Sequence, residues 1–587
     1  MANTIGWGKA VENNTNGFGK LATNTIGAGA IYESSASGET ALLASSVQEE
    51  FIFRVDTTLP GATPSNQFQI KTTGGPYNYD VDWGDGQTDT GVTSSTGISH
   101  TYDTGGEYDI KISGTFPQIF YNNNSEGDKI TEIKNWGIIQ WSSFDRAFMG
   151  CNNLDLTATD YPDLTNCTTL HRIFNGCSSF ENTNGSIGGW DTSTITNMDG
   201  VFAGCVLFNQ SINNWDVSNV TSFGPGFNRG MFTSCFAFNQ PLNNWDVSSC
   251  TRFNQMFQNC YAFNQDLSSW RFHTTLNVGF GSMFKSATSF NNGGQDGIKD
   301  WNTNMANSFS GMFYGASSFN QPLTNWNTSN VAGAGFKSMF RSNTSFNQDI
   351  SHFDVSNGTD FREMFRSATS FNNGGQTGIN NWSIKTTGNV LMSSMFFGAT
   401  SFNQPIGNWD VSAVSSFQNF LYNATSFNQN VTNLISTIQG PSNLVTITYM
   451  FSDSEPTADW TQFPFQYVNG SALRAFRSVN DFDQNVSNWQ IPSTVSNMSQ
   501  MFASTGLSNT DFTDTVVGWA VYIYNNGGVP SGINFSGNGK TFDGTRTSDD
   551  ESGQTYAVKY GANWTATGWT DAQDAFDYLV TTLNWSI

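Results

Sequence analysis

Apolar residues return along this chain at two alternating spacings. In the stretch "ITNMDGVFAGCVLF", which begins at Ile195, they recur at steps of three and four residues, as in a short helix with one face in a core. The next stretch, "NQSINNWDVSNV" from Asn209, places Ile, Trp, Val and Val at steps of three, two and three residues. Its W-x-V step predicts a short strand whose alternate residues face inward.

This two-part pattern repeats through most of the chain. The Phe or Leu of the dipeptide "MF" and its variants stands at positions 148, 174, 202, 232, 257, 284, 313, 340, 365, 396, 421, 451, 476 and 502. Because neighbouring members are 25 to 31 residues apart, the period predicts a solenoid whose coils bury their apolar faces only against one another. We therefore predict an α/β solenoid of about 14 coils over residues 119–505, with a parallel sheet of stacked strands and one short helical turn per coil.

An asparagine follows the second Phe of most repeats. The positions are Asn209, Asn239, Asn264, Asn291, Asn320, Asn347, Asn372, Asn403 and Asn428. A short amide at a bend can bond both to its own backbone and to the next coil, so that buried polar groups are satisfied. We predict an asparagine ladder, and a glycan-binding row of amides is the alternative.

Two repeats carry a matched insertion. The strings "FNNGGQDGIKDW" from Phe290 and "FNNGGQTGINNW" from Phe371 are longer between Phe and Trp than the other repeats, and we expect the extra Gly-rich residues to form surface loops. A tolerated insertion is the favoured interpretation. A pair of loops that contacts a ligand is the alternative.

The positions between the inward residues of the predicted strand are the best candidates for a binding surface. On a parallel sheet they would project outward in a row about 4.8 Å apart. The candidate ligand-facing residues are Asp216, Asp246, Arg271, Asn302, Asn327, Asp354, Ser383 and Asp410. Such a polar, short-chained row suits hydrogen bonding to a glycan or a protein surface, and a simply solvated face is the alternative.

The seven cysteines occupy inward positions of the repeat. Five of them stand three residues after the "MF" position, at Cys151, Cys177, Cys205, Cys235 and Cys260, and from Ala287 onward this slot is usually alanine. Cys167 and Cys250 fall where Ile195 and Val220 stand in their own coils. A slot that needs only a small apolar side chain predicts core thiols rather than disulfides or a metal site.

Residues 47–118 have a different sequence pattern, in which short runs of alternating apolar and polar residues are separated by turns rich in Gly, Pro and Asp. This predicts a small all-β sandwich. The strings "DWGDG" and "HTYDTGGEYDIKI" resemble the polycystic kidney disease (PKD) domain, matching its W-x-F-G-D-G, H-x-Y and G-x-Y-x-V pattern at Trp83, Gly84, Asp85, Gly86, His100, Tyr102, Gly106, Tyr108 and Ile110. Asp80, Asp82 and Asp85 could hold Ca²⁺, but a hydrogen-bonded turn is the favoured interpretation.

The repeats resemble the bacterial surface-protein 26-residue repeat, a BspA-like branch of the leucine-rich repeats. The strings "NWDVSNVTSF", "MFTSCFAFNQPLNNWDVSS" and "MFFGATSFNQPIGNWDVSAV" carry that pattern, and the resemblance covers roughly Ile130 to Thr505. It implies a leucine-rich-repeat-like solenoid and a role in adhesion or surface recognition. It does not imply a ligand.

The first 46 residues contain a small repeat of their own, "NTIGWGKA", "NTNGFGKL" and "NTIGAGAI". This Gly-rich segment, for which we expect order only when it is bound, is similar to N-terminal segments of phage tail and fibre proteins. It therefore predicts an anchor to other virion proteins, and a flexible bacterial leader is the alternative. At the other end, residues 506–587 break the repeat with two helical patterns, which we expect to cap the last coil.

Composition and charge limit the classes of partner that the protein can bind. The net charge is -23 with only 24 Lys+Arg, so we expect no basic stripe, no nucleic-acid partner and no electrostatic attraction to a membrane. We expect no export peptide and no membrane helix. The four histidines are far apart and no catalytic fingerprint is present, so no cofactor and no enzyme activity are expected.

Together these features predict a phage virion appendage, such as a tail fibre, that displays a repeat solenoid to a glycan or protein of the host surface. A bacterial cell-surface or secreted adhesin is the alternative, and an enzyme acting on polysaccharide is a distant third. Homo-oligomerisation stays open.

Overall fold

The computed structural model describes the backbone of residues 31–34 and 40–43. Backbone and side chains are described for residues 49–224, 230–440, 444–527, 530–536, 538–549 and 553–587. Contacts divide the chain into two units, Met1–Glu49 and Glu50–Ile587. In the first unit β1 (Ile31–Ser34) pairs antiparallel with β2 (Thr40–Leu43), and the remainder of the predicted anchor over residues 1–46 lies outside the described residues.

Two sheets form the front of the second unit. Strands β3 (Phe51–Asp56), β8 (Glu107–Thr115), β5 (Asn78–Asp82) and β6 (Thr88–Val92) are neighbours in the larger sheet, and β4 (Gln67–Ile70) pairs with β7 (Ile98–Thr101) in the smaller one. Alternate residues of β3 are buried, as the sequence pattern predicts, and the ring of Phe53 lies 6.0 Å from that of Phe68 on β4. The two sheets therefore share one aromatic core.

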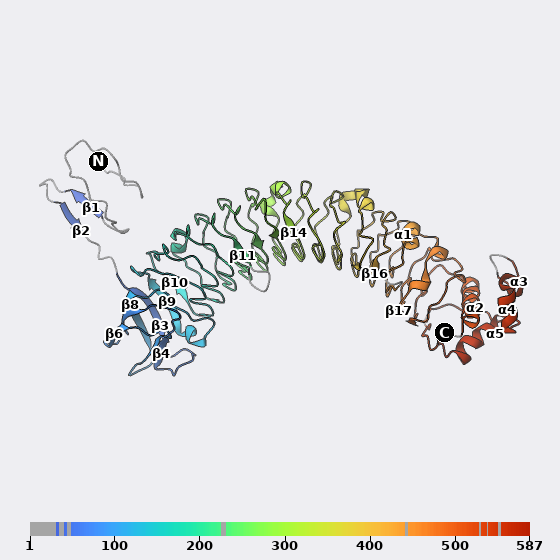
Figure 1. Ribbon diagram of the computed structural model, residues 1–587, viewed down its shortest axis with the longest axis horizontal. Coiled ribbons are helices and arrows are strands. Elements are labelled where there is room, and N and C mark those ends of the chain that lie inside the picture. The colour runs from blue at the N-terminus through green and yellow to red at the C-terminus, as the bar shows by residue number, and fades with distance from the viewer. Residues whose placement is uncertain are drawn as a thin grey trace. The chain divides into compact units, whose positions relative to one another are not determined.

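The larger sheet continues into the first coil. Strand β9 (Ile130–Asn135), which follows the 3-10 turn η1 (Ser125–Lys129), pairs antiparallel with β3 and parallel with β10 (Asp155–Leu156). Backbone hydrogen bonds thus run from the front sheets across the predicted domain boundary at residue 118 (Figure 1).

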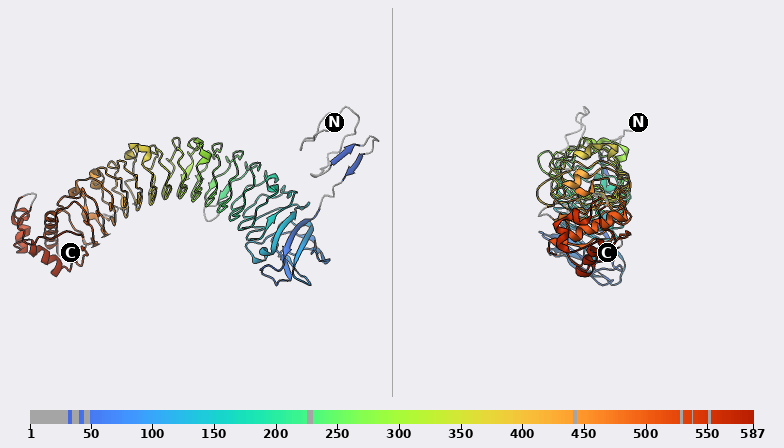
Figure 2. Two further views of the ribbon diagram at one scale, coloured as in Figure 1. Left: turned by 180° about the vertical axis from the view of Figure 1, so that it is seen from behind. Right: turned by 90° about the vertical axis from the view of Figure 1, so that its right-hand side faces the viewer.

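Beyond β10 the chain winds in successive coils joined by short parallel strands (Figures 1 and 2). Strands β11 (Ser222–Gly224), β12 (Arg252–Phe253), β13 (Val278–Gly279) and β14 (Ala306–Ser308) form one such sheet. Further along, β15 (Val390–Leu391) pairs with β16 (Val414–Ser416), and β17 (Gly470–Ser471) pairs with β18 (Val495–Asn497). Isolated parallel bridges, such as Gly333 with Gly358, continue the pairing between other coils.

The predicted position of the strand is wrong. The W-x-V step of residues 215–217 lies outside any strand, and the paired segment begins at Ser222. The alternation of buried and exposed residues is present at W-x-V, but side chains rather than a backbone ladder join the coils there: the Thr192 hydroxyl donates to the carbonyl of Asp216 in the next coil at 2.9 Å.

The predicted helical turn is wrong as well. In residues 280–290 the chain makes three consecutive turns, in which the N–H groups of Met283, Ala287 and Phe290 donate to carbonyls three residues earlier. Ser282 and Ser286 have φ of 55° and 58°, in the left-handed region, which no helix contains. Each turn advances three residues, so a row of turns gives the apolar spacing of a helix.

Rings and amides stack from coil to coil. The rings of Phe232, Phe257, Phe284 and Phe313 follow one another at centroid distances of 5.5, 5.5 and 5.8 Å, tilted by no more than 7°. Beside them the asparagine ladder is confirmed. From Asn209 to Asn428, each side-chain oxygen accepts the backbone N–H of the next asparagine, at 2.8–3.0 Å.

The two Gly-rich insertions form paired 3-10 turns, η3 (Asn292–Gly294) with η4 (Gly297–Asp300) and η5 (Asn373–Gly375) with η6 (Thr377–Asn381). The amides of Asn292 and Asn373 are fully buried, and each accepts a backbone N–H of the preceding coil, at 2.8 and 2.9 Å. The insertions are therefore fastened to the coil beneath them. Other short turns are η2 (Ser186–Gly189), α1 (Thr432–Ser436), η8 (Trp460–Gln462) and η9 (Phe465–Tyr467).

The C-terminal part begins with α2 (Asn509–Asn525), whose first turn is capped by the hydroxyl of Ser508. The indole N–H of Trp519 donates to the carbonyl of Val486 at 3.0 Å, a bond that the tryptophans of the coils also make. Parallel bridges run on from Asn497 to Asn534 and Ser586. The helices α3 (Tyr556–Tyr560), α4 (Ala562–Thr567) and α5 (Ala572–Asp577) and the π-helical turn η10 (Tyr578–Thr582) complete this part.

Candidate functional site

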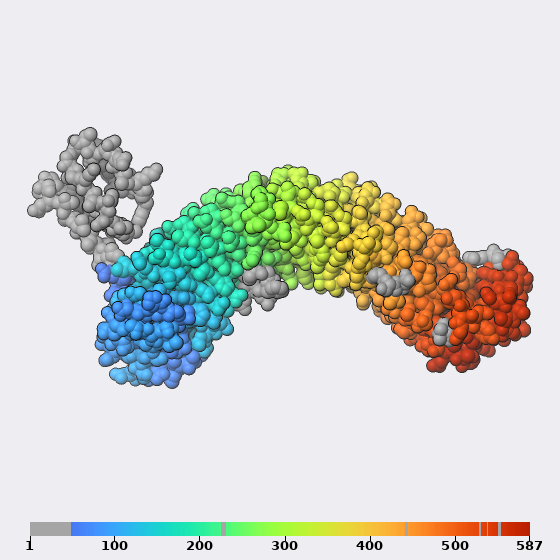
Figure 3. All heavy atoms as spheres, in the orientation of Figure 1, coloured from blue at the N-terminus to red at the C-terminus, as the bar shows by residue number. Residues whose placement is uncertain are grey.

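The predicted ligand-facing residues form a surface that we call the tryptophan-edge row. It consists of Asp216, Asp246, Arg271, Asn302, Asn327, Asp354, Ser383 and Asp410, each of which follows a buried Trp or Phe and is itself exposed. Exposure agrees with the prediction, whereas the strand on which the row was placed does not exist at this position. On the face drawn in Figure 3, the described coils form a continuous surface without a deep cleft.

Most of the row also shapes the chain locally. In six of its members a side-chain oxygen accepts the backbone N–H two residues further on, at 2.9–3.1 Å; they are Asp216, Asp246, Asn302, Asn327, Asp354 and Asp410. The side-chain and backbone hydrogen bonds from Ser218 lower the pKa of Asp216. One oxygen of each carboxylate is therefore committed to a turn, and the other is the atom available to a partner.

The amides of the row connect neighbouring coils. The side-chain amide of Asn327 donates to the side-chain oxygen of Asn304 at 2.9 Å, and its backbone N–H donates to the hydroxyl of Thr303 at 2.7 Å. Arg271 turns back instead, because its guanidinium donates to the carbonyls of Ser268 and Trp270 at 2.9 and 2.8 Å. The row is thus held in place by the coil rather than free to reorient.

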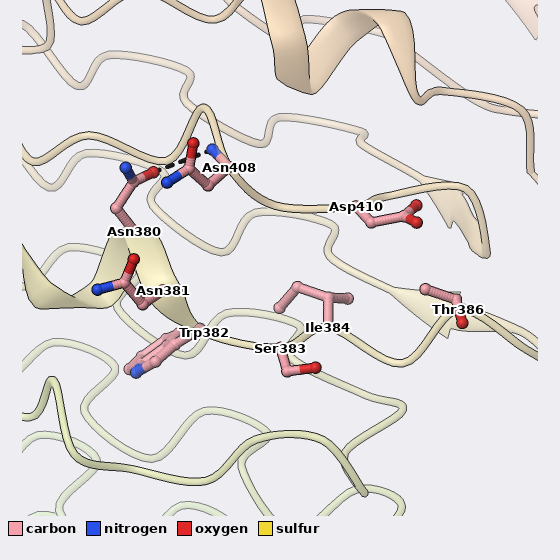
Figure 4. Close-up of a pocket in the computed structure, with 8 residues that line it drawn as sticks. All are labelled: Asn380, Asn381, Trp382, Ser383, Ile384, Thr386, Asn408 and Asp410. Atoms are coloured by element: carbon pink, nitrogen blue, oxygen red, sulfur yellow. Dashed lines mark hydrogen bonds between the residues drawn. The ribbon is translucent and has the colours of Figure 1, made fainter.

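Two open hollows lie at the row's C-terminal end. One of about 340 Å³ is lined by Asn380, Asn381, Trp382, Ser383, Ile384, Thr386, Asn408 and Asp410 (Figure 4). In that view the hydroxyls of Ser383 and Thr386 and the carboxylate of Asp410 lie on one side, and the three amides lie on the other. The second, of about 370 Å³, shares Asn408 and Asp410. Such a mixture of donors and acceptors suits a ligand rich in hydroxyl groups.

The asparagine ladder leaves little for a ligand. The side-chain oxygen of Asn320 accepts the backbone N–H of Asn347 at 2.9 Å and the side-chain amide of Gln348 at 3.0 Å. Because the oxygens of the ladder are occupied in this way, the alternative of a glycan-binding row at these positions has no support from the geometry.

The burial of the cysteines is confirmed. All seven are free thiols in the core, and Cys235 and Cys260 donate to carbonyls of the preceding coil, at 2.9 and 3.0 Å. Burial raises the pKa of all seven thiols, and that of Cys250 to about 12. They are small side chains packed in the core between coils, and none is a reactive thiolate at neutral pH.

The three aspartates considered for Ca²⁺ are each engaged separately. Asp80 accepts the N–H of Gly91 at 2.7 Å. Asp82 accepts the N–H of Gly84, which, with the Lys111 ammonium 3.0 Å away, lowers the pKa of this carboxyl. Asp85 bonds to the His100 ring at 2.8 Å. Across the described ranges, no group of three or more His, Cys, Asp or Glu side chains could hold a metal ion.

A second exposed feature was missed by sequence reasoning. Lys285, Arg341, Arg366 and Arg474 lie in one row with surface aromatic residues, so the expectation of no basic stripe is wrong. Net charge averages over the whole chain and hides such a row. Reading the residue that follows each "MF" Phe down the aligned repeats would have found Lys285, Arg341 and Arg366.

The coils and their exposed polar row are those of a tandem-repeat protein. A family model described as "Mycoplasma protein of unknown function, DUF285" matches residues 142–229, 168–296, 283–390, 374–463 and 440–515. These overlapping matches span more than half of the chain, and the protein belongs to this family. The match is consistent with a BspA-like repeat protein and does not reach the front sheets or the first 46 residues.

Neither the curated proteins nor the solved structures contain a match to this chain. Within the part of the chain that the structure describes, none of the helices has the length and apolarity needed to cross a membrane.

Proposed function

We propose that this protein is a non-enzymatic adhesin that uses the repeat coils, a leucine-rich-type solenoid, as a display surface. The observation that carries the proposal is the tryptophan-edge row, which presents exposed carboxylates and amides from successive coils in positions fixed by their own turns. Pre-positioned polar groups lose little entropy on binding, so a repeating array of them suits an extended glycan or protein surface.

Attachment to a virion is the version we favour, with residues 1–46 bound to other virion proteins and the front sheets as a PKD-like spacer. The support is the glycine-punctuated repeat near the N-terminus and its likeness to phage tail and fibre segments. The ligand would then be a glycan or protein of the host envelope.

A bacterial cell-surface adhesin is the second candidate. Its support is the family description, which names Mycoplasma, a bacterium. Both candidates use the same binding surface. They differ in whether the first 46 residues attach the protein to other virion proteins.

The binding test uses purified full-length protein on envelope fractions of candidate host cells. Asp354→Ser and Asp410→Ser together retain a side-chain oxygen for each turn but remove two exposed charges, and we expect binding to fall about tenfold. Asp543→Ser is the matched control, because Asp543 makes the same turn, at 3.0 Å to the N–H of Thr545, outside the coils. Equal binding by all three proteins would exclude the row as the adhesive surface.

The location test removes residues 1–30. Loss of the protein from purified particles, with envelope binding intact, would support virion attachment. Incorporation of the truncated protein at the full level would contradict the anchor.

A further inference from the structure

A continuous chain of basic and aromatic side chains crosses the middle and later coils. We call it the cation–aromatic strip, and its members are Lys285, Tyr314, Arg341, Arg366, Phe397, Tyr422, Tyr449 and Arg474. The first six stand directly after the Phe or Leu of the "MF" position, and the last two stand two residues before it. All eight are partly exposed.

The members contact one another from coil to coil. Lys285 Nζ and the Arg341 guanidinium lie 5.0 and 4.8 Å from the ring centroid of Tyr314. The guanidinium of Arg366 lies 4.6 Å from the ring of Phe397. These are cation–π distances.

Aromatic contacts carry the strip onward. The rings of Phe397 and Tyr422 are 5.1 Å apart, and those of Tyr422 and Tyr449 are 5.2 Å apart. Arg474 then lies 5.6 Å from the ring of Tyr449. Between the two halves, Glu363 bonds to Arg341 and, at 2.8 Å, to Arg366, so the contacts are unbroken from Lys285 to Arg474.

Positive charge is concentrated on the strip. The strip contains four cations, Lys285, Arg341, Arg366 and Arg474, each lying 4.6–5.6 Å from one of its ring centroids. The acidic residue that forms ion pairs with these cations is Glu363, which lies against Arg341 and Arg366. In a chain with a net charge of -23, four cations that share one paired carboxylate make a local positive track.

Packing alone does not account for this arrangement. The side chains of Arg341 and Arg366 retain 27% and 34% of their exposed area, so they reach solvent. A ring face fixes the plane of a stacked guanidinium and leaves its edge to donate hydrogen bonds. The strip therefore holds two planar donors, Arg341 and Arg366, in fixed positions on adjacent coils, where a bidentate carboxylate fits.

We propose that the cation–aromatic strip binds a carboxylate-bearing polysaccharide that lies across the coils. The proposal rests on the adhesive function above and adds to it a second binding surface with a ligand class of its own. Consecutive coils are spaced about 4.8 Å apart, comparable to the length of one sugar ring. A polymer along this direction would present its carboxylates to successive cations and its hydroxyls to the Tyr hydroxyls.

The strip suits a nucleic acid less well. Nucleic acid carries one phosphate per roughly 3.4 Å of each strand, far denser than the unpaired cations here. Base stacking also needs open ring faces, and the ring of Tyr314 is flanked by two cations.

The experiment measures binding of the full-length protein to immobilised polygalacturonate, with dextran as the neutral polymer and a single-stranded oligonucleotide as the competing anion. We expect binding to polygalacturonate that weakens with salt, and little binding to dextran. The double variant Arg341→Gln, Arg366→Gln should lose about tenfold or more in affinity. The matched control Arg252→Gln, Lys299→Gln removes the same charge away from the strip and should stay within about twofold.

A gain-of-binding variant separates recognition from folding. Glu363→Gln removes the carboxylate that competes for Arg341 and Arg366, so we expect affinity for polygalacturonate to rise about threefold. A purely structural ion pair would give no gain.

The outcomes distinguish this inference from the adhesive function. Envelope binding without polygalacturonate binding would overturn the strip's ligand class and leave the adhesin standing. Polygalacturonate binding through the strip, without envelope binding, would refute the adhesin alone. Tighter binding of the oligonucleotide than of polygalacturonate would assign the strip to nucleic acid, and equal loss in the control pair would show non-specific charge attraction.

Discussion

At the scale of single residues, the asparagine ladder explains how polar groups survive between stacked coils. Asn320 illustrates it, because its side-chain oxygen accepts two hydrogen bonds from the next coil. One side-chain oxygen therefore satisfies both a backbone donor and a side-chain donor of the next coil.

Asn320→Ala should lower the free energy of unfolding by about 1–3 kcal/mol, because the N–H of Asn347 would lose its acceptor. Asn325→Ala, which removes only an exposed bond to Asp300, is the control and should cost less than about 0.5 kcal/mol. Urea unfolding followed by tryptophan fluorescence measures both. A similar cost for the two variants would argue against the ladder as a stabilising element.

The buried thiols give a second prediction at this scale. Because burial raises the pKa of all seven, iodoacetamide at pH 8 should leave the folded protein unmodified. The same reagent in guanidinium chloride should modify all seven cysteines, as intact-mass spectrometry would show. Rapid modification of any of them in the folded state would mean that its coil opens.

At the scale of elements, the turns of each coil depend on residues in the left-handed region. The position of Ser286, with φ of 58°, is taken by Gly315 in the next coil and by Gly398 further on. A β-branched residue is strained there, so Ser286→Val should cost about 1–2 kcal/mol, whereas Ser286→Gly should be close to neutral.

Ser289→Val is the control for this prediction, because Ser289 is exposed and close by without a positive φ. Thermal unfolding followed by circular dichroism would compare the three variants. Equal midpoints for Ser286→Val and Ser289→Val would contradict the turn.

The front sheets give a pH-dependent prediction. Arg54, on β3, donates to Asp109, on β8, at 2.8 Å, and this hydrogen bond, helped by Lys134, lowers the pKa of the carboxyl. A carboxyl with a lowered folded-state pKa stabilises the fold above its unfolded pKa of about 3.9 and loses that contribution as pH falls through the folded value.

Asp109→Asn should therefore lower the stability by about 0.5–1 kcal/mol at pH 7, since the pair is about one-third exposed, and by much less at pH 2.5. Melting temperatures of the two proteins at both pH values test it. A difference that persists unchanged at the lower pH would mean that charge is not the cause.

The sequence was a good guide to which residues are buried and a poor guide to the backbone they lie on. The length of the repeat, the buried positions of the cysteines and the asparagine ladder could all be predicted from the spacing of residues, because the same positions are buried in each coil. The backbone conformation could not be predicted in this way. Successive three-residue turns have the same apolar spacing as a helix, and an extended segment such as W-x-V alternates buried and exposed residues even when no neighbouring strand pairs with it. The residues of the tryptophan-edge row were placed on the surface correctly, but for their turns rather than for a sheet.

At the scale of the whole molecule, the later coils separate charge by position. Carboxylates and amides make up most of the tryptophan-edge row, and four cations, Lys285, Arg341, Arg366 and Arg474, lie on the cation–aromatic strip. Composition alone could not show this separation, because the net charge of -23 sums over both surfaces. Two surfaces of different chemistry would let one array of coils bind an acidic polymer on one and a hydroxyl-rich ligand on the other.

The C-terminal part covers the end of the coils, and this gives the last prediction. Met498 and Gln500 donate backbone hydrogen bonds to Asn534 and Ser536 at 2.7 and 2.9 Å, and the ring of Trp519 packs 6.1 Å from that of Phe502.

Removal of residues 506–587 would expose these N–H groups together with the apolar end of the stack, which is an edge ready to pair with another chain. We expect the truncated protein to associate as its concentration rises, whereas the full chain keeps a constant mass under the same conditions. Light scattering after size-exclusion chromatography measures both, with a deletion of residues 1–30 as the control for truncation itself. A truncated protein whose mass is independent of concentration, and whose melting temperature equals that of the full chain, would mean that residues 506–587 do not protect the last coil.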